Sequence, residues 1–463
     1  MKNKIPLFSL VLLIVAAIDS IRTLPTTAFF GSPLILLFLL SAAFFLIPVS
    51  LVSAEFSSRF PEEGGIFHWV RQAFGAKIGL LAVWLQWINT MVWYPTMLLF
   101  IAGTITYIVD PQLAEDKVSL LLINLSTFWG LTLLNLKGIR VSARFNSFCS
   151  VIGTLLPMVF LIFLGVWWIV AGNPLSISFS MDALIPSANM SEIGGALITI
   201  MASFLGMELA GVHINDIQNP QKNFPKAIGF AVMILLGTLI FGALSIAVII
   251  PKEEIRFVDG IMQTFTTFLG AFHLSFLIPV LAIFIVIGSI GGSVNWLLSP
   301  AKGLVQAAEH GFFPAYFLKK NHHDVPVRIL ISQAILVSVL CCALQFMSSV
   351  NAYYWFLMAL STGLYMFMYV LLFMAALKLG RPEKQSLGYK IPRGIRTLSC
   401  MFGLGACLAT IILGFQPVDG VIIASTLNYV CIIIASVALV IAPVFYFWGY
   451  KTKQDLDPDI VQT

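Results

Sequence analysis

Polar and charged residues crowd the middle of the first apolar segment of the chain. In the stretch IVAAIDSIRTLPTTAFFG the polar and charged residues are Asp19, Ser20, Arg22, Thr23, Thr26 and Thr27, and Pro25 lies among them. A guanidinium in an apolar environment needs a partner, and its planar fork suits a carboxylate. Two interpretations of Arg22 therefore stay open: it binds the carboxylate of a solute, or it forms a structural ion pair with Asp19 or Glu208. We expect Asp19 to serve Arg22 rather than a solute ammonium group.

A second apolar segment, ALITIMASFLGMELAGVHIND, is interrupted in the same way. Ser203, Gly206, Glu208 and Gly211 lie around its centre. Small and polar residues at this point favour a local unwinding of the helix, and Pro25 does the same in the first segment because it lacks an amide hydrogen. Glu208 is either a proton carrier or gate, or a carboxyl group tied to the freed backbone; both interpretations stay open.

The composition defines the environment in which these residues must function. Of 463 residues, 10% are charged and 59% are hydrophobic, with 38 Phe and a mean hydropathy of +0.96. Soluble proteins carry about 25% charged residues, so a soluble fold and a disordered chain are both excluded. The six cysteines show no metal-ligand spacing, and we expect no metal site, no cofactor and no disulfide framework.

Long continuous apolar runs indicate helices rather than a barrel, since a helix needs about 20 apolar residues to cross a bilayer. Twelve spans are predicted, at 7–29, 34–56, 79–109, 118–136, 147–171, 194–215, 226–250, 274–299, 326–347, 352–377, 396–416 and 424–450. With this count, 22 of the 26 Lys and Arg fall on the side of the N-terminus. Both termini are therefore predicted to be cytoplasmic, and the net charge of +5 gives no indication of nucleic-acid binding.

The spans form a single transmembrane domain, 1–463, with internal symmetry. The interrupted spans are the first helices of two five-helix blocks, 7–171 and 194–377, followed by helices 11 and 12 at 396–450 and a cytoplasmic tail, 451–463. Five is odd, so the blocks run in opposite senses through the membrane as an inverted repeat. The segment 301–313 is mildly amphipathic and is expected at the membrane interface.

Paired interruptions at matching places in two halves indicate the binding site of a transporter. Unwound backbone at mid-membrane is tolerated only where it borders a cavity. The amides of one half-helix suit a carboxylate, and carbonyl groups of the other can accept an ammonium group. A zwitterionic α-amino acid fits this arrangement.

At these same residues the chain resembles the amino acid–polyamine–organocation transporters, and most closely their glutamate/γ-aminobutyrate antiporter group. Tyr365 and Tyr369, four residues apart, match helix 10 of that group. The other matching motifs are LPTTAFFGS (24–32), IPVSLVSAEF (47–56), PEEGGIFHWV (61–70), GMELAGVHINDIQNPQKNFPKA (206–227) and SPAKG (299–303). The chain departs from the group at Gly292, where related exchangers carry an acid, at Arg22, and in ending 13 residues after Tyr450 without a long plug-forming tail.

The resemblance implies an all-α integral membrane fold of twelve helices, with a leucine-transporter-type 5+5 inverted repeat and discontinuous helices 1 and 6. It implies amino acid exchange or uptake by alternating access. The candidate substrate-binding residues are Ser20, Arg22, Thr23, Thr26, Thr27, Trp93, Ser203, Phe204, Gly206, Asn295, Trp296 and Tyr365. The candidates for gating or proton coupling are Asp19, Glu208 and Tyr369.

The predicted protein is thus a multi-pass amino acid transporter of the cell (inner) membrane, a permease or antiporter. Its partners are the lipid bilayer and a small solute, an amino acid or its decarboxylation product; a homodimer stays open. A proton-coupled amino acid or polyamine symporter is the alternative within the class. A channel and a non-transporting sensor stay open from other classes, whereas the chain lacks the motifs of a membrane enzyme.

Overall fold

The computed structural model describes residues 6–60, 65–137, 149, 151–186, 189–208, 219–323, 325–380, 389–418 and 425–456. Helices make up the regular structure of these ranges, apart from one isolated bridge between Lys320 and Pro326. The longer helices are α3 (Leu34–Ser41), α4 (Ile47–Arg59), α5 (Ile66–Phe74), α6 (Ala76–Val109), α7 (Lys117–Leu136), α9 (Leu156–Val170), α11 (Met190–Phe204), α12 (Pro220–Ile249), α13 (Gly260–Ala271), α14 (Ile278–Glu309), α15 (Val327–Cys342), α16 (Val350–Leu379), α17 (Arg393–Gly414) and α18 (Thr426–Leu456). The first span comprises α1 (Leu7–Ile18), η1 (Ile21–Thr23) and α2 (Leu24–Ala28), and α10 (Met181–Leu184) is a single turn.

Nine helices in these ranges are long and apolar enough to cross a membrane. They coincide with the predicted spans 2 to 5, 7 and 9 to 12. The first and sixth predicted spans fall short because their helices end early. The eighth lies on the continuous helix α14, in which several side chains after Gly291 are outside the described structure. The chain is therefore a multi-pass membrane protein, while the total of twelve spans stays a prediction.

The first span is broken just after its midpoint. Helix α1 ends at Ile18, after which Asp19 (φ −64°, ψ 126°) and Ser20 (φ −144°, ψ 116°) are extended. Pro25 lies in the first turn of α2, where no amide hydrogen is required, so it starts the second half-helix rather than causing the break. The first two residues of the polar run, Asp19 and Ser20, thus form a non-helical link, and the rest of the run lies in η1 and α2.

The sixth span also leaves the helical conformation at the predicted place. Helix α11 ends at Phe204, Leu205 is extended (ψ 142°), and Gly206 has a φ of +93°, which a side chain would make costly. Glu208 follows within the described chain. The continuation at 209–218 lies outside the described residues.

Two π-helical turns have a common cause. The segments Ala42–Leu46 and Val151–Leu155 each end two residues before a proline, Pro48 and Pro157. Proline has no amide hydrogen and its ring clashes with the carbonyl four residues earlier, so the preceding turn widens. Both segments continue as α-helices, α4 and α9.

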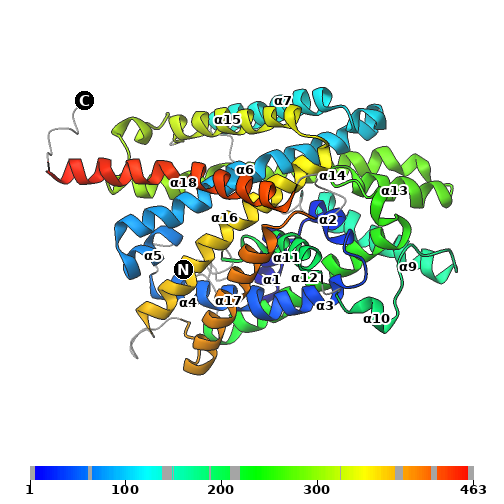
Figure 1. Cartoon of the computed structure of the whole chain (residues 1–463), viewed down its shortest axis with the longest axis horizontal. Coiled ribbons are helices and arrows are strands. Elements are labelled where there is room, and N and C mark those ends of the chain that lie inside the picture. Colours follow the sequence, from blue (N-terminus) through cyan, green and yellow to red (C-terminus); the bar gives the residue numbers. More distant parts are fainter. Residues whose placement is uncertain are drawn as a thin grey trace.

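Helix α6 packs against both α14 and α16, and these are the most extensive helix contacts in the described bundle. Glycines permit a close approach between the turn Val151–Leu155 and α14: a Cβ added to Gly153 would lie 2.3 Å from the Gly288 Cα. Figure 1 shows α5 at one end of the bundle and α10 and α13 at the other, as expected for loops on opposite sides of a membrane.

One sequence expectation about the loops was wrong, and another loop contains a helix that the sequence analysis did not predict. The segment 301–313 is not a separate interfacial element, because α14 continues to Glu309 and buries Ala301, Leu304 and Ala308 against the bundle. The connection after α12 contains the helix α13. This helix has too few apolar residues to be predicted from the sequence as a membrane span. Gly260 at the start of α13 packs on Pro25 of α2, so this helix covers one half of the broken first span.

Candidate substrate site between the broken helices

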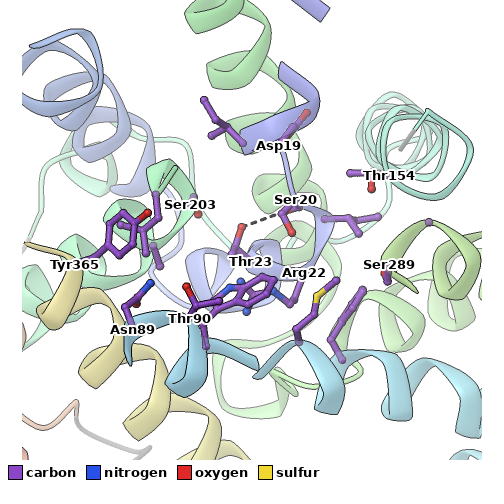
Figure 2. Close-up of a pocket in the computed structure, with 18 residues that line it drawn as sticks. Asp19, Ser20, Arg22, Thr23, Asn89, Thr90, Thr154, Ser203, Ser289 and Tyr365 are labelled. Atoms are coloured by element: carbon purple, nitrogen blue, oxygen red, sulfur yellow. Dashed lines mark hydrogen bonds between the residues drawn. The ribbon is translucent and has the colours of Figure 1, made fainter. Parts of the chain in front are cut away.

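A cavity of about 120 Å³ lies at the break of the first span. By the measure on which one water needs about 10–15 Å³, it has room for roughly ten water-sized groups, the size of a small amino acid. Figure 2 shows polar side chains from several helices gathered around it. Its lining residues are Ile18, Asp19, Ser20, Ile21, Arg22, Thr23, Asn89, Thr90, Trp93, Met97, Phe100, Thr154, Ala202, Ser203, Leu205, Gly288, Ser289 and Tyr365.

Arg22 is held on one side of this cavity by neutral partners. Its Nη1 donates to Thr96 Oγ1 at 3.0 Å and to Tyr354 Oη at 2.8 Å. The guanidinium also lies 5.3 Å from the centre of the Trp93 ring, a cation–π distance. Arg22 is 5% exposed, and its Nε has no hydrogen-bond partner. None of these three contacts neutralises its charge.

The expected ion pair between Asp19 and Arg22 is absent from the described structure. Both oxygens of the Asp19 carboxyl lack a hydrogen bond, although the side chain is only 8% exposed. The Ser20 amide and the Thr238 hydroxyl lie nearby without the geometry of a hydrogen bond. The expectation failed because it assumed a continuous helix, in which residues three apart share a face; the extended residues 19 and 20 turn the two side chains apart, as Figure 2 shows.

Glu208 joins the sixth span to two neighbouring helices. Its Oε1 accepts from Tyr365 Oη at 2.6 Å and from Gln86 Nε2 at 3.2 Å, and its Oε2 accepts from Tyr369 Oη. The Gly206 amide donates to Tyr369 Oη at 3.2 Å, so the cluster also satisfies backbone freed by the break. Among the described residues, Glu208 accepts from these three donors, and the hydrogen bonds of Arg22 go to Thr96 and Tyr354 instead.

The end of the bundle that holds α13 is tied by charged groups. Arg256 Nη2 lies 3.1 Å from Asp259 Oδ2 and its Nη1 lies 3.3 Å from Glu115 Oε1. Tyr107 Oη donates to Asp259 Oδ2 at 2.9 Å. Burial raises the pKa of the Asp259 carboxyl, and the charge of Arg256 opposes that rise. This network anchors the start of α13 to α6 beside the half-helix α2.

The cavity brings together part of the predicted residue set. Asp19, Ser20, Arg22, Thr23, Trp93, Ser203 and Tyr365 line it. Thr26 and Thr27 are buried, and their hydroxyls donate to the backbone carbonyls of Thr23 and Leu24. Four further predicted residues are not among the lining residues: Phe204, Gly206, Glu208 and Tyr369. The side chains of Asn295 and Trp296 lie outside the described structure.

Several residues of the site escaped the sequence analysis. Asn89, Thr90 and Thr154 line the cavity, while Tyr354 and Gln86 hold Arg22 and Glu208. Asn89 Oδ1 accepts from Ser361 Oγ at 2.5 Å, which fixes the α6–α16 contact. Polar residues in apolar spans generally indicate a functional interior, and that signal applied to Gln86 and Asn89.

Comparison with known proteins identifies the family. The amino acid permease family model matches residues 5–437. An uncharacterized transporter of Legionella pneumophila is 36% identical over 98% of both chains. The glutamate/gamma-aminobutyrate antiporter of Lactococcus lactis is 28% identical over 100% of this chain and 93% of its own.

A solved structure supports the fold. The manganese transporter of Eremococcus coleocola superposes with a TM-score of 0.59 at 13% identity, covering 96% of this chain and 94% of that protein. At this identity the likeness concerns the fold alone. Together with the broken helices and the cavity between them, these matches show that the chain belongs to the amino acid permease family of the amino acid–polyamine–organocation superfamily, and that it is a transporter rather than an enzyme.

Proposed function

We propose that this protein is an amino acid antiporter or permease of the cell membrane, and that it works by alternating access around the cavity between its first and sixth spans. The full architecture is twelve spans, with helices 1–10 as a 5+5 inverted repeat and both termini in the cytoplasm. The charge asymmetry of the loops supports this orientation.

One observation supports the proposal most strongly. The cavity borders non-helical backbone of both interrupted spans, at Asp19 and Ser20 on one side and at Leu205 on the other. Helices α6, α14 and α16 and the π-helical turn Val151–Leu155 supply the remaining walls. A solute bound there contacts both halves of the molecule, so it stabilises the closed form through which a loaded carrier changes sides.

The Glu208 cluster supports a gate beside this site. Tyr365 lines the cavity and shares its acceptor with Gln86, while Tyr369 holds the unwound Gly206 amide. Separation of α11 from α16 requires that these hydrogen bonds break together. The cluster thereby couples the wall of the cavity to the helix that must move.

Counterflow in proteoliposomes tests the proposal. Liposomes containing the purified protein and an unlabelled amino acid should accumulate the labelled form transiently, with each of the twenty amino acids and common amines tested in turn. Trp93→Ala should abolish the accumulation because it removes a cavity wall, whereas Trp129→Ala, on the exposed side of α7, should retain it. A channel or a sensor gives no counterflow, and that result across the panel would refute the proposal.

A further inference from the structure

We propose that Asp19 binds the ammonium group of the transported solute and that the cavity thereby selects solutes of zero net charge. This inference rests on the function proposed above and adds a substrate class to it. Asp19 is named among the gating candidates by the sequence, yet its position in the structure favours direct contact with the solute.

The first argument is the condition of the Asp19 side chain. It is more than nine-tenths buried, it lines the cavity, and neither carboxyl oxygen has a hydrogen-bond partner among the described residues. A buried carboxylate without a partner is strongly unfavourable. An ammonium group supplies three N–H donors and a compensating charge. A bound amine therefore provides the hydrogen bonds and the positive charge that the Asp19 carboxylate lacks.

The second argument is the place of Asp19 in the helix. It is the C-cap residue of α1, and its own amide donates to the Val15 carbonyl. The C-terminal end of a helix carries partial negative charge and favours cations. An acid at this position weakens the helix end unless a cation lies beside it, and no described Lys or Arg side chain contacts Asp19.

Arg22 supplies the complementary group on the other side of the unwound segment. Its neutral partners, Thr96 and Tyr354, fix the guanidinium without neutralising it, and its Nε stays available. In Figure 2 Asp19 lies above Ser20 and Arg22 lies below it. A solute with a carboxylate at one end and an ammonium group at the other can satisfy both.

The charges around the cavity then define the solute class. Among the described lining residues, Asp19 and Arg22 are the two charged ones, and they sum to zero. Glu208 is not available, because its carboxylate is bound by two tyrosines and a glutamine. A solute with an extra charge would leave that charge buried without a partner. Of the two solutes in the name of the Lactococcus lactis relative, γ-aminobutyrate meets the condition and glutamate at neutral pH does not.

Two charge-deleting variants test the assignment in the full-length protein. Binding and counterflow near neutral pH are measured with leucine, glutamine and γ-aminobutyrate, with the charged solutes glutamate and putrescine, and with matched analogues. Butyrate is γ-aminobutyrate without its amine, and propylamine is the same molecule without its carboxylate; 4-methylpentanoate and 3-methylbutylamine are the corresponding analogues of leucine. Asp19→Asn and Arg22→Gln are compared with the exposed-site controls Asp182→Asn and Lys319→Gln.

Wild type should prefer its best net-neutral amino acid over glutamate and putrescine by about 100-fold or more. Asp19→Asn should weaken the binding of that amino acid by a similar factor, while the affinity for the carboxylate analogue stays within about threefold of the wild-type value. Arg22→Gln should also weaken the binding of the amino acid, but it should leave the affinity for the amine analogue within the same range. Retained binding of one analogue shows that the variant is folded. Both controls should behave as wild type.

The failures are distinguishable. If wild type exchanges amino acids but accepts glutamate or putrescine equally well, or if Asp19→Asn exchanges them unchanged, the inference is overturned while the proposed function stands. If wild type binds and exchanges nothing in the panel, both are overturned.

Discussion

The ion pair between Glu55 and Arg396 offers the sharpest test of how the bundle is held together. Arg396 Nε donates to Glu55 Oε1 at 2.6 Å, the Ile391 amide donates to Glu55 Oε2 at 2.9 Å, and Arg396 Nη2 donates to the Ala376 carbonyl. The side chains are 3% and 7% exposed. The pair thus joins α4, α16 and the start of α17 in a water-poor environment.

The expected magnitudes follow from this burial. Glu55→Met or Arg396→Met leaves one buried charge without its partner, which costs about 3–5 kcal/mol. The double replacement leaves no buried charge, and its cost reduces to the orphaned Ile391 amide and Ala376 carbonyl, about 1–3 kcal/mol each. The double variant should therefore cost clearly less than the sum of the single variants, roughly 6–10 kcal/mol.

Equilibrium unfolding in detergent, followed by circular dichroism, measures these differences. The Lys252–Glu192 pair is a matched control, with a similar separation of 3.1 Å but side chains that are 42% and 37% exposed. Lys252→Met should change the free energy of unfolding by less than about 1 kcal/mol. Additive effects of the two single variants, or equal effects of the buried and exposed pairs, would refute the reasoning.

Three further predictions concern the close helix contact, a helix cap and the gate. Gly288→Ala should lower the free energy of unfolding by about 1–3 kcal/mol and slow counterflow, because its Cβ would lie 2.4 Å from the Gly153 Cα; Gly237→Ala, which meets open space, should do neither. Hydrogen bonds from Ser119 hold the pKa of the Asp116 carboxyl below its usual value, so its contribution to stability is present above about pH 4 and disappears as the pH falls through the lowered pKa. Asp116→Ala should therefore lower the thermal midpoint at neutral pH and not in acid, and a loss that is equal at every pH would contradict this. Glu208→Gln should weaken the tyrosine cluster by about 1.5–3 kcal/mol and change the counterflow rate; an unchanged rate would show that the cluster is not a gate.

Much of the fold follows from local sequence alone, because in lipid every backbone polar group must be satisfied within its own helix. The apolar runs therefore marked nine spans that the structure contains. The polar run at Asp19 and Arg22 likewise marked the break of the first span, and Gly206 marked the end of α11. The resemblance to the permease motifs gave the family, which the comparisons confirm.

Only the tertiary structure decided which residues became the hydrogen-bond partners of the buried charged side chains. The sequence spacing suggested that Arg22 pairs with Asp19, whereas the folded chain gives Arg22 a threonine from α6 and a tyrosine from α16, over 70 and 330 residues away. Glu208 takes two tyrosines, which sequence had placed on one helix face without an acceptor. Hydrogen bonds act over about 3 Å, so they depend on how distant helices cross. The apolar character of a segment is local, and for that reason the sequence itself could indicate where the chain crosses the membrane but not which partners its buried charges would meet.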